Sequence, residues 1–364
     1  MNAIELMVTL WPSFPHFPRF ANDRRLGGIR LNSAMMSSPE LDRELATISE
    51  LAPANPLWYD IKGRQMRVAE VIPNAHHLEV VLNHPISVKT PTVVLFKAGA
   101  DFALLKRIED GGRRLIFDGG PRYVVKAGES LHIRHHSLVV HGPLFTDGEL
   151  AKIEKVKAFG FKRWFLSYVE EQSDIDRFLE LVGTDAEVML KIESRQGLAF
   201  VADQFVKRPN LTLVAARGDL YVEIDRPHQI TKALRLIIDK DPEAVVASRL
   251  LLSTVFDTVG TALRLVVETG KGPEISSRLP LTTIFNPVPE ALRKTIERGE
   301  GRIVEPRVLL ERIYDPVPSC ADFLEIAWLI DIGYRRMMLC DELCLKEELL
   351  NVAVNAFDAF RKDY

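Results

Sequence analysis

Apolar residues along this chain follow two spacings that alternate with each other. Short apolar runs that end in charged residues are typical of strands buried on both faces of a sheet. Stretches in which apolar residues recur every three or four positions are typical of helices packed on such a sheet. The short runs predict eight strands, at residues 4–10, 28–32, 56–60, 163–168, 187–192, 211–216, 244–251 and 335–340. Strands that alternate with helices predict a parallel sheet, and eight of them favour a closed (β/α)8 TIM barrel of the α/β class.

A different pattern fills residues 68–140. Short runs rich in β-forming residues are separated there by glycine-containing turns, which predicts a small all-β unit. The runs predict strands at residues 78–82, 92–96, 102–108, 113–117, 122–125 and 130–133. We therefore predict a barrel of residues 1–67 and 141–364, with an all-β lid domain at residues 68–140 between strand 3 and helix 3. A polar, proline-containing insertion at about residues 255–315, with candidate helices at 288–297 and 307–313, follows the seventh strand.

Composition narrows the class of protein. The chain has 364 residues and a net charge of −3, so no general attraction to nucleic acid or to an anionic membrane is expected. No apolar run approaches the roughly 20 residues that span a bilayer. The three cysteines, Cys320, Cys340 and Cys344, are too few for a disulfide scaffold and are typical of a protein in the reducing cytoplasm. The first strand is not followed by a GxGxxG fingerprint, which argues against a dinucleotide-binding sheet.

Charged side chains follow two neighbouring predicted strands at the point where each strand ends. Lys191 and Glu193 end the run at 187–192, and Asp219 follows the run at 211–216. In a barrel, polar groups at the carboxyl ends of strands form the active site. One cation and two carboxylates there could hold a divalent metal and an anionic substrate together. The alternative is that these charges only cap exposed strand ends, although Gly218 would let the backbone approach a ligand closely.

Seven short motifs, in the same order along the chain, resemble those of the pyruvate kinase family. Residues 191–193 (Lys-Ile-Glu) and 216–220 (Ala-Arg-Gly-Asp-Leu) match that family's signature nearly letter for letter. Similar matches cover residues 30–32 (Arg-Leu-Asn), 60–67 (Asp-Ile-Lys-Gly-Arg-Gln-Met-Arg), 167–169 (Ser-Tyr-Val), 247–251 (Ala-Ser-Arg-Leu-Leu) and 338–342 (Met-Leu-Cys-Asp-Glu). The family also carries a lid domain between its third strand and third helix. Its C-terminal regulatory domain is expected to be missing, because the chain ends just after the predicted eighth helix.

The resemblance implies a role for each matched residue. Mg²⁺ or Mn²⁺ would be bound by Glu193 and Asp219, and would hold phosphoenolpyruvate or pyruvate. The catalytic residues would be Lys191, which neutralises a phosphoryl group or enolate, Ser248, which relays a proton, and Arg30, which grips phosphate.

The resemblance also implies binding sites for the rest of the substrates. Backbone N–H groups of Ala216, Arg217 and Gly218 would hold the substrate carboxylate. Arg67 would contact the phosphates of a nucleotide such as ADP. Asn32 and Asp60 would remain from the family's K⁺ site.

The departures from the family pattern fall at one end of the expected site. Ala34 replaces a K⁺-binding serine, Met35 replaces the motif histidine, Ile61 replaces a threonine, and Gly148 replaces a nucleotide-contacting lysine. The metal and oxoacid end is therefore nearly intact, whereas the ADP and K⁺ end is eroded.

Three functions stay open at this point. The first is a pyruvate kinase-like phosphotransferase that acts on phosphoenolpyruvate with a nucleoside diphosphate. The second is a metal-dependent lyase, an aldolase or decarboxylase that works through a pyruvate enolate, because the same charges stabilise that enolate. The third is a non-catalytic binding protein on the same scaffold. A monomer and a homodimer are equally compatible with the sequence.

Histidines in the predicted lid form a separate group. His132, His135 and His136, with His76 and His77, could bind a metal. Strand alternation would point adjacent members to opposite faces, so surface imidazoles without a ligand are the expected reading.

Overall fold

The computed structural model describes residues 4–33, 38–74, 76–252 and 318–364. One compact unit is formed by Met1–Leu250 and Leu324–Leu345, and a second by Leu251–Phe323 and Lys346–Tyr364. The predicted insertion at 255–315 with its two helices, and the departures Ala34 and Met35, lie outside the described residues.

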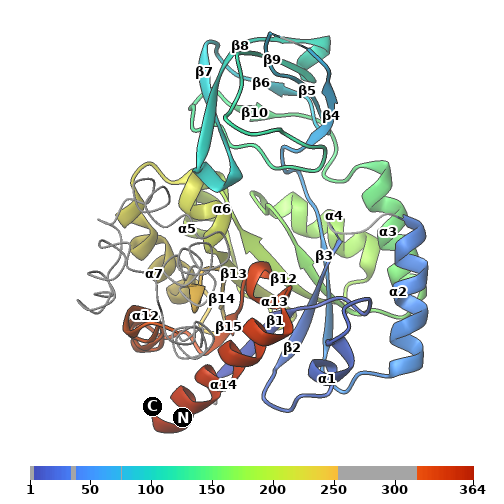
Figure 1. Ribbon diagram of the computed structural model, residues 1–364, viewed down its shortest axis with the longest axis vertical. Helices are drawn as coiled ribbons and strands as arrows, with labels where there is room; N and C mark the ends of the chain where they lie inside the picture. The colour runs from blue at the N-terminus through green and yellow to red at the C-terminus, as the bar shows by residue number, and fades with distance from the viewer. Residues whose placement is uncertain (1–3, 34–37, 75, 253–317) are drawn as a thin grey trace, which may run out of the picture. The chain divides into compact units, whose positions relative to one another are not determined.

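The first unit contains a closed barrel of eight parallel strands, as the apolar runs predict (Figure 1). Around the barrel the strand order is β1-β15-β14-β13-β12-β11-β3-β2. The strands are β1 (Glu5–Thr9), β2 (Gly28–Asn32), β3 (Leu57–Ile61), β11 (Arg163–Leu166), β12 (Glu187–Ile192), β13 (Leu211–Ala216), β14 (Val245–Ala247) and β15 (Arg336–Met338). The prediction of a mixed α/β protein with a parallel barrel is confirmed.

Ten helices are found in the described part of the chain, and most follow a barrel strand in sequence. They are α1 (Phe17–Ala21), α2 (Ser38–Leu51), α3 (Asp147–Ala158), α4 (Gln172–Val182), α5 (Arg195–Asp203), α6 (Arg217–Glu223), α7 (Ile230–Lys240), α12 (Cys320–Asp331), α13 (Asp341–Cys344) and α14 (Glu347–Asp363). Local sequence sets several of their ends. Thr146 caps α3 by accepting a hydrogen bond from the Glu149 backbone N–H, and Ser194 caps α5 in the same way from Gly197. None of these helices combines the length and apolar character that a bilayer crossing requires.

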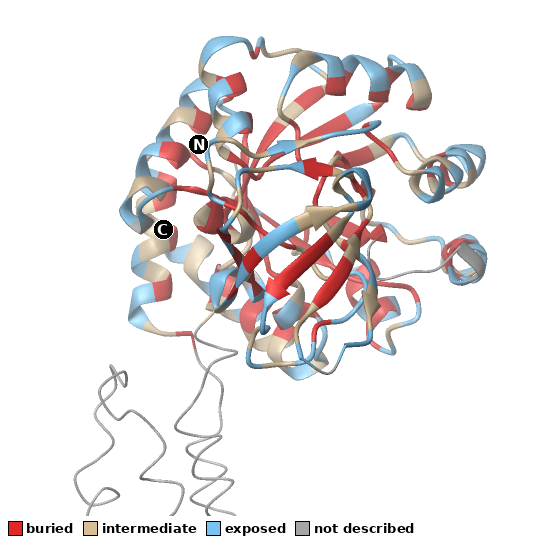
Figure 2. Ribbon diagram, turned by 90° about the horizontal axis from the view of Figure 1, so that it is seen from above, coloured by how far each residue is buried: buried red, intermediate tan, exposed pale blue. Residues whose placement is uncertain are grey.

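Side chains that point into the barrel pack as one apolar cluster. Met7, Trp58, Phe165, Met189 and Val214 contribute to it from five different strands. The barrel strands are mostly buried, and Figure 2 shows helices with exposed residues on their outer faces. Because side chains alternate along a strand, the residue two positions after each of these also faces inward, nearer the carboxyl end. This alternation decides which polar residues meet at that end of the barrel.

Residues between β3 and α3 form antiparallel sheets, as their sequence pattern predicts. A five-stranded sheet has the order β4-β5-β9-β8-β7, and a two-stranded sheet pairs β10 with β6. The strands are β4 (Val68–Ile72), β5 (Glu79–Leu82), β6 (Ile86–Ser87), β7 (Thr92–Phe96), β8 (Asp101–Glu109), β9 (Arg114–Asp118) and β10 (Val139–Val140). This antiparallel segment belongs to the same compact unit as the barrel. That it is a separate lid domain with boundaries at 68 and 140 stays a prediction.

Several predicted element boundaries are wrong for local reasons. The predicted strands at 122–125 and 130–133 are absent, and only single bridges from Ser130 to Arg67 and from His132 to Leu95 are found there. Strand β14 ends at Ala247 rather than 251, because Ser248 and Arg249 have φ angles of 70° and 60°, which strand geometry excludes. Helices α6 and α13 were missed, since each is too short to show a helical repeat.

Candidate functional site

Five polar side chains meet at the carboxyl end of the barrel. Three of them lie two positions after an apolar residue that faces into the barrel. Asp60 lies two positions after Trp58, Ser167 after Phe165, and Lys191 after Met189. Arg30 joins them from the middle of β2, and Lys62 from the position just after β3. All five are buried, with relative exposures between 0% and 8%. We refer to Asp60, Arg30, Lys62, Lys191 and Ser167 as the Asp60 cluster.

Asp60 lies at the centre of this cluster. Its Oδ2 accepts hydrogen bonds from Arg30 Nε at 2.8 Å, Lys62 Nζ at 3.2 Å and Lys191 Nζ at 3.3 Å. Its Oδ1 accepts from Ser167 Oγ at 3.0 Å. The backbone approaches closely here, because a Cβ on Gly63 would lie 2.3 Å from the Ser167 carbonyl oxygen. Both carboxylate oxygens of Asp60 are therefore held by donors of the chain itself.

The charges in the cluster shift one another's proton affinities. Burial disfavours the ionised form of Asp60, but Lys191, Lys62 and Arg30 together hold the pKa of its carboxyl far below the usual range. Burial also opposes the charge of Lys191, yet Asp60 and Glu193 raise its pKa above the ordinary value. Burial lowers the pKa of Lys62 to about 8, in spite of Asp60. Both lysines carry a positive charge at neutral pH, and Lys191 holds its proton more tightly than Lys62 does.

Glu193 links the cluster to the second predicted metal ligand. Its Oε1 lies 3.0 Å from Lys191 Nζ, and its Oε2 accepts a hydrogen bond of 2.8 Å from the Tyr168 backbone N–H. Tyr168 has a φ of 54°, an uncommon conformation for a residue other than glycine. Burial raises the pKa of Glu193, Lys191 lowers it, and the negative charge of Asp219 raises it further. The negative charges of Glu193 and Asp219 thus repel each other.

Asp219, on α6, faces the antiparallel segment. His132 of that segment is fully buried, and its Nε2 lies 3.5 Å from Asp219 Oδ1. The other ring nitrogen, Nδ1, lies 2.8 Å from Glu223 Oε1. The expectation of a surface imidazole is therefore wrong for His132, although His136 is exposed and His135 is half-buried. We refer to His132, Asp219 and Glu223 as the His132 site.

The remaining residues predicted to bind substrate lie where β13 ends and β14 ends. Ala216 is the N-cap of α6 and makes no side-chain capping bond. A Cβ on Gly218 would lie 3.1 Å from Ser248 Oγ, so glycine permits this close approach. The Arg217 side chain donates from Nε and Nη2 to the Ser248 carbonyl oxygen, at 3.0 and 2.7 Å. The Arg217 guanidinium thus stabilises the strained turn at Ser248, so we do not expect this side chain to bind a substrate.

The residues predicted for the nucleotide and for K⁺ are engaged within the chain. Arg67 Nε donates to Gln65 Oε1 at 2.9 Å, and Arg67 Nη1 donates to the Gly128 carbonyl oxygen at 2.6 Å. The Asn32 amide donates to Asp341 Oδ2 at 2.9 Å. Asp60 Oδ2 is likewise engaged by Arg30, Lys62 and Lys191. Their predicted roles stay predictions.

Sequence reasoning missed two contributors to the site and misjudged a third, His132. Asp341 binds Arg30 Nη1 at 2.7 Å, whereas its neighbour Glu342, predicted at the strand end, is exposed. Thr9 accepts from the same Arg30 nitrogen at 3.1 Å. Counting two residues beyond Met7 on the inward face would have found Thr9. His132 carried no usable signal, because its segment lacks regular strand structure.

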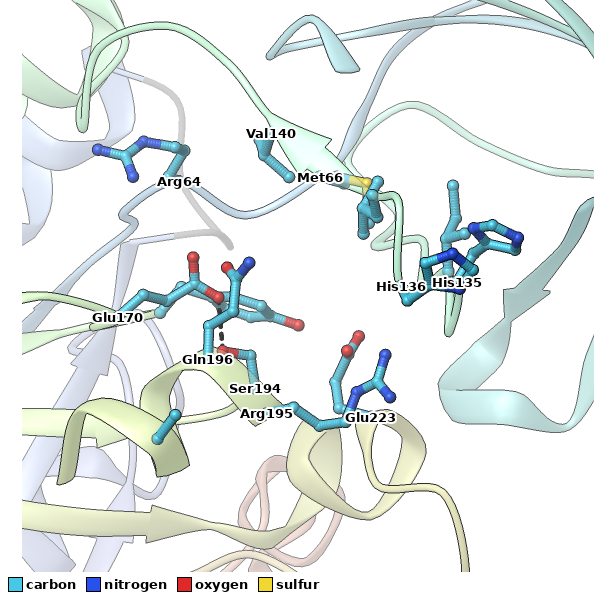
Figure 3. A pocket seen from close by; sticks show the side chains of 14 residues that line it. Arg64, Met66, His135, His136, Val140, Glu170, Ser194, Arg195, Gln196 and Glu223 are labelled. Carbon is cyan, nitrogen blue, oxygen red and sulfur yellow. Dashed lines mark hydrogen bonds between the residues drawn. The ribbon is translucent and has the colours of Figure 1, made fainter. Parts of the chain in front are cut away.

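A cavity of about 340 Å³ adjoins the His132 site (Figure 3). Tyr168 and Glu223 line it, and Glu170 lies at one side, where it accepts a 2.5 Å hydrogen bond from Ser194 Oγ. The Gln196 amide, oriented so that its nitrogen faces the carboxylate, donates to both Glu170 oxygens at 2.9 and 3.2 Å. Burial raises the pKa of Glu170 to about 7. The cavity therefore combines an apolar wall with a carboxyl group that titrates near neutral pH.

The donor chemistry of the site fits a divalent cation. Glu193 and Asp219 supply hard carboxylate oxygens, which Mg²⁺ and Mn²⁺ prefer. Within residues 4–33, 38–74, 76–252 and 318–364, no three histidine, cysteine or acidic side chains surround a common metal position. Mg²⁺ is commonly bound by one or two carboxylates together with substrate oxygens and water, so a pair of ligands suffices for the fit.

No family model matches the chain, and no curated protein matches it. The resemblance to pyruvate kinase therefore rests on the short motifs alone and stays a prediction.

Proposed function

We propose that the protein is a divalent-metal-dependent enzyme that acts on the enol form of a small 2-oxoacid. Its reaction would be phosphoryl transfer from phosphoenolpyruvate to a nucleoside diphosphate, which gives pyruvate. The observation that carries the proposal is the position of Lys191: a buried, protonated ammonium group held between Asp60 and Glu193 at the carboxyl end of the barrel. A fixed positive charge in a buried site stabilises a developing enolate or phosphoryl charge far better than the same charge in water.

The neighbouring residues supply the rest of the chemistry in this proposal. Lys191 binds the oxygen that bridges phosphorus and the enol carbon, and stabilises the enolate as the P–O bond breaks. Arg30 acts as a fixed positive charge and does not bind phosphate through two N–H groups, because Asp60, Asp341 and Thr9 already accept hydrogen bonds from its guanidinium group. Ser248, on the strained turn beside Gly218, relays the proton that converts the enolate methylene carbon to the methyl group of pyruvate.

A bound divalent cation, held by Glu193 and Asp219, would neutralise charge on the substrate oxygens. Backbone N–H groups of Ala216, Arg217 and Gly218, at the start of α6, would orient the substrate carboxylate. In this proposal the chain itself supplies a preorganised field, and the substrate completes the site.

The second candidate, a lyase that works through the pyruvate enolate, is favoured by one observation. Arg67, the residue proposed to bind nucleotide phosphate, is tied to Gln65 and to the Gly128 carbonyl oxygen. Its engagement leaves the oxoacid end better formed than the nucleotide end. A lyase would use Lys191 for the same enolate and would need no nucleotide.

The deciding experiment measures two reactions in one sample. Pyruvate formation from phosphoenolpyruvate is assayed with a panel of nucleoside diphosphates, Mg²⁺ or Mn²⁺, with and without K⁺. Deuterium exchange into the methyl group of pyruvate is then followed by NMR. Lys191→Met should abolish both activities, and the exposed Lys162→Met serves as the matched control.

The outcomes separate the candidates. Turnover with any nucleoside diphosphate supports the phosphotransferase. Metal-dependent exchange without such turnover supports the lyase. Absence of both activities together with absence of metal binding would overturn the proposal in favour of a binding protein.

A further inference from the structure

A buried imidazole nitrogen points at Asp219 without a hydrogen-bond partner among the described residues. This atom is Nε2 of His132, in a side chain with 0% exposure. Its distance of 3.5 Å to Asp219 Oδ1 is an ionic contact, longer than an ordinary hydrogen bond. Buried polar atoms are nearly always paired, so this nitrogen calls for a physical explanation.

The ring is held firmly from the other side. Nδ1 contacts Glu223 Oε1 at 2.8 Å, and the Tyr168 hydroxyl lies 3.5 Å from the same nitrogen. The backbone of His132 is fixed by two hydrogen bonds with Leu95, of 2.8 and 3.1 Å. Arg134 also donates to the Val222 carbonyl oxygen, which ties the segment to α6. The direction of Nε2 is therefore set by the fold.

This arrangement has the form of a metal-binding histidine. Such a histidine donates its second ring N–H to a carboxylate, which fixes the tautomer and the ring orientation. Ligand atoms bound at about 2.0–2.2 Å to one cation lie about 3–3.5 Å apart, which is the spacing of Nε2 and Asp219 Oδ1. We propose that Nε2 of His132 binds the same divalent cation as Asp219, with Glu223 as the positioning residue behind the ring. This inference rests on the proposed function only for the presence of a cation at Asp219.

The added imidazole changes which cation the site prefers. Carboxylate and water ligands suit Mg²⁺, whereas imidazole suits the transition metals and zinc. An imidazole ligand beside the Asp219 carboxylate therefore makes the site bind Mn²⁺ more tightly than a site of carboxylates alone. Without a metal, a proton takes this position: burial lowers the proton affinity of the ring, but Asp219 and Glu223 outweigh it and raise the pKa of His132 to about 9.

The competing explanation is a plain ion pair. In that case a permanently protonated His132 only fastens the antiparallel segment to α6 and never binds a metal. The two explanations differ in one observable, which is direct coordination of the cation by a ring nitrogen.

The test uses the full chain and Mn²⁺ alone, with neither substrate present. Mn²⁺ affinity is measured by the loss of the free-ion EPR signal, and pulsed EPR reports nitrogen coupled to the bound ion. Wild-type protein should show coupling from one imidazole nitrogen. His132→Asn, whose amide can still donate to Glu223, should lose the coupling and bind Mn²⁺ at least tenfold more weakly, while Mg²⁺ affinity changes less than threefold. The exposed His136→Asn is the matched control and should behave as wild type.

A second variant guards against a failure of His132→Asn to fold. Glu223→Gln keeps the ring but weakens its orientation, so the coupling should persist while Mn²⁺ affinity falls severalfold. Bound Mn²⁺ without nitrogen coupling in the wild type overturns the inference, whatever the variants do. Equal Mn²⁺ affinity in wild type and folded His132→Asn overturns it as well.

The failure of this inference and the failure of the catalytic proposal give different results. Nitrogen coupling in a protein that has neither kinase nor exchange activity supports the histidine ligand and refutes the proposed function. Activity in a protein whose Mn²⁺ shows no nitrogen coupling does the reverse.

Discussion

Two groups of buried charges lie at the carboxyl end of the barrel, and they differ in how completely the chain satisfies them. In the Asp60 cluster both carboxylate oxygens and three cations are paired within the protein. In the His132 site one buried ring nitrogen has no hydrogen-bond partner among the described residues. A fully paired group fixes an electrostatic field, whereas a group with spare coordination is where a ligand completes the structure. We therefore expect the Asp60 cluster to control stability and the His132 site to control ligand binding.

The largest effect is expected from breaking the paired group. Asp60→Asn removes the charge that three buried cations share, which should lower the free energy of unfolding by about 3–5 kcal/mol. Asp219→Asn should cost far less and should abolish metal binding instead. Urea denaturation of both variants, with the exposed Asp118→Asn as control, measures this difference. Equal losses for Asp60 and Asp219 would remove the contrast between the two groups.

The next effect separates two lysines of the Asp60 cluster. Both contact Asp60, but Lys191 also contacts Glu193 and Ser167. Lys191→Met should lower the rate of pyruvate methyl exchange about 10²–10³-fold, the usual cost of losing one preorganised charge at a developing oxyanion. Lys62→Met should lower it less than tenfold. A larger loss for Lys62→Met than for Lys191→Met would mean that Lys62, and not Lys191, provides the catalytic charge.

A smaller effect concerns a half-buried carboxyl outside both groups. Burial raises the pKa of Glu170 to about 7 from an ordinary value of 4.5, the opposite of the shift at Asp60. The folded protein therefore holds this proton more tightly than the unfolded chain. Stability should fall as pH rises from about 4.5 to about 7 and then level off.

Glu170→Gln removes that pH dependence. Its stability advantage over wild type should grow between pH 4.5 and 7 and stay constant above pH 7, by on the order of 1 kcal/mol after solvent screening. Urea denaturation at several pH values measures it, with the exposed Glu180→Gln as control. An advantage that is constant from pH 4.5 to 8 would show that Glu170 ionises normally.

The smallest effect concerns the nucleotide end. If the phosphotransferase proposal is right, Arg67→Ala should raise the KM for the nucleoside diphosphate about tenfold, because one charge-assisted phosphate contact is lost. Pyruvate methyl exchange should change less than twofold. Steady-state kinetics and exchange in the same preparation test this, and a parallel loss of both activities would mean that Arg67 acts on the whole site.

The barrel and its polar rim could be predicted from sequence because both follow from short-range rules. Apolar runs predicted the full lengths of β12 and β13, and the charged end of the first run placed Lys191 at the carboxyl end of the barrel. The order of the motifs also placed Glu193 and Asp219 at the same rim. These inferences need only the period of a strand and the chain order of parallel strands.

The rest depends on long-range contacts that no local pattern encodes. His132 meets Glu223 across 91 residues, from a stretch without regular secondary structure. The positive φ angles at Tyr168 and Ser248 ended two strands earlier than their apolar residues suggested. Arg217 is the residue type expected at a substrate site, but its side chain stabilises the Ser248 turn by a hydrogen bond to the Ser248 carbonyl oxygen. Residue identity alone could not distinguish these roles.

The distance in sequence between His132 and Asp219 has a consequence for how firmly the protein holds together. On the proposed ligand set, one cation cross-links the antiparallel segment to α6, so attachment of the segment follows the free metal concentration by mass action. A metal present at 100 times its Kd would add about 2.7 kcal/mol to that attachment. A higher free metal concentration would then attach the antiparallel segment to α6 more stably, before any substrate binds.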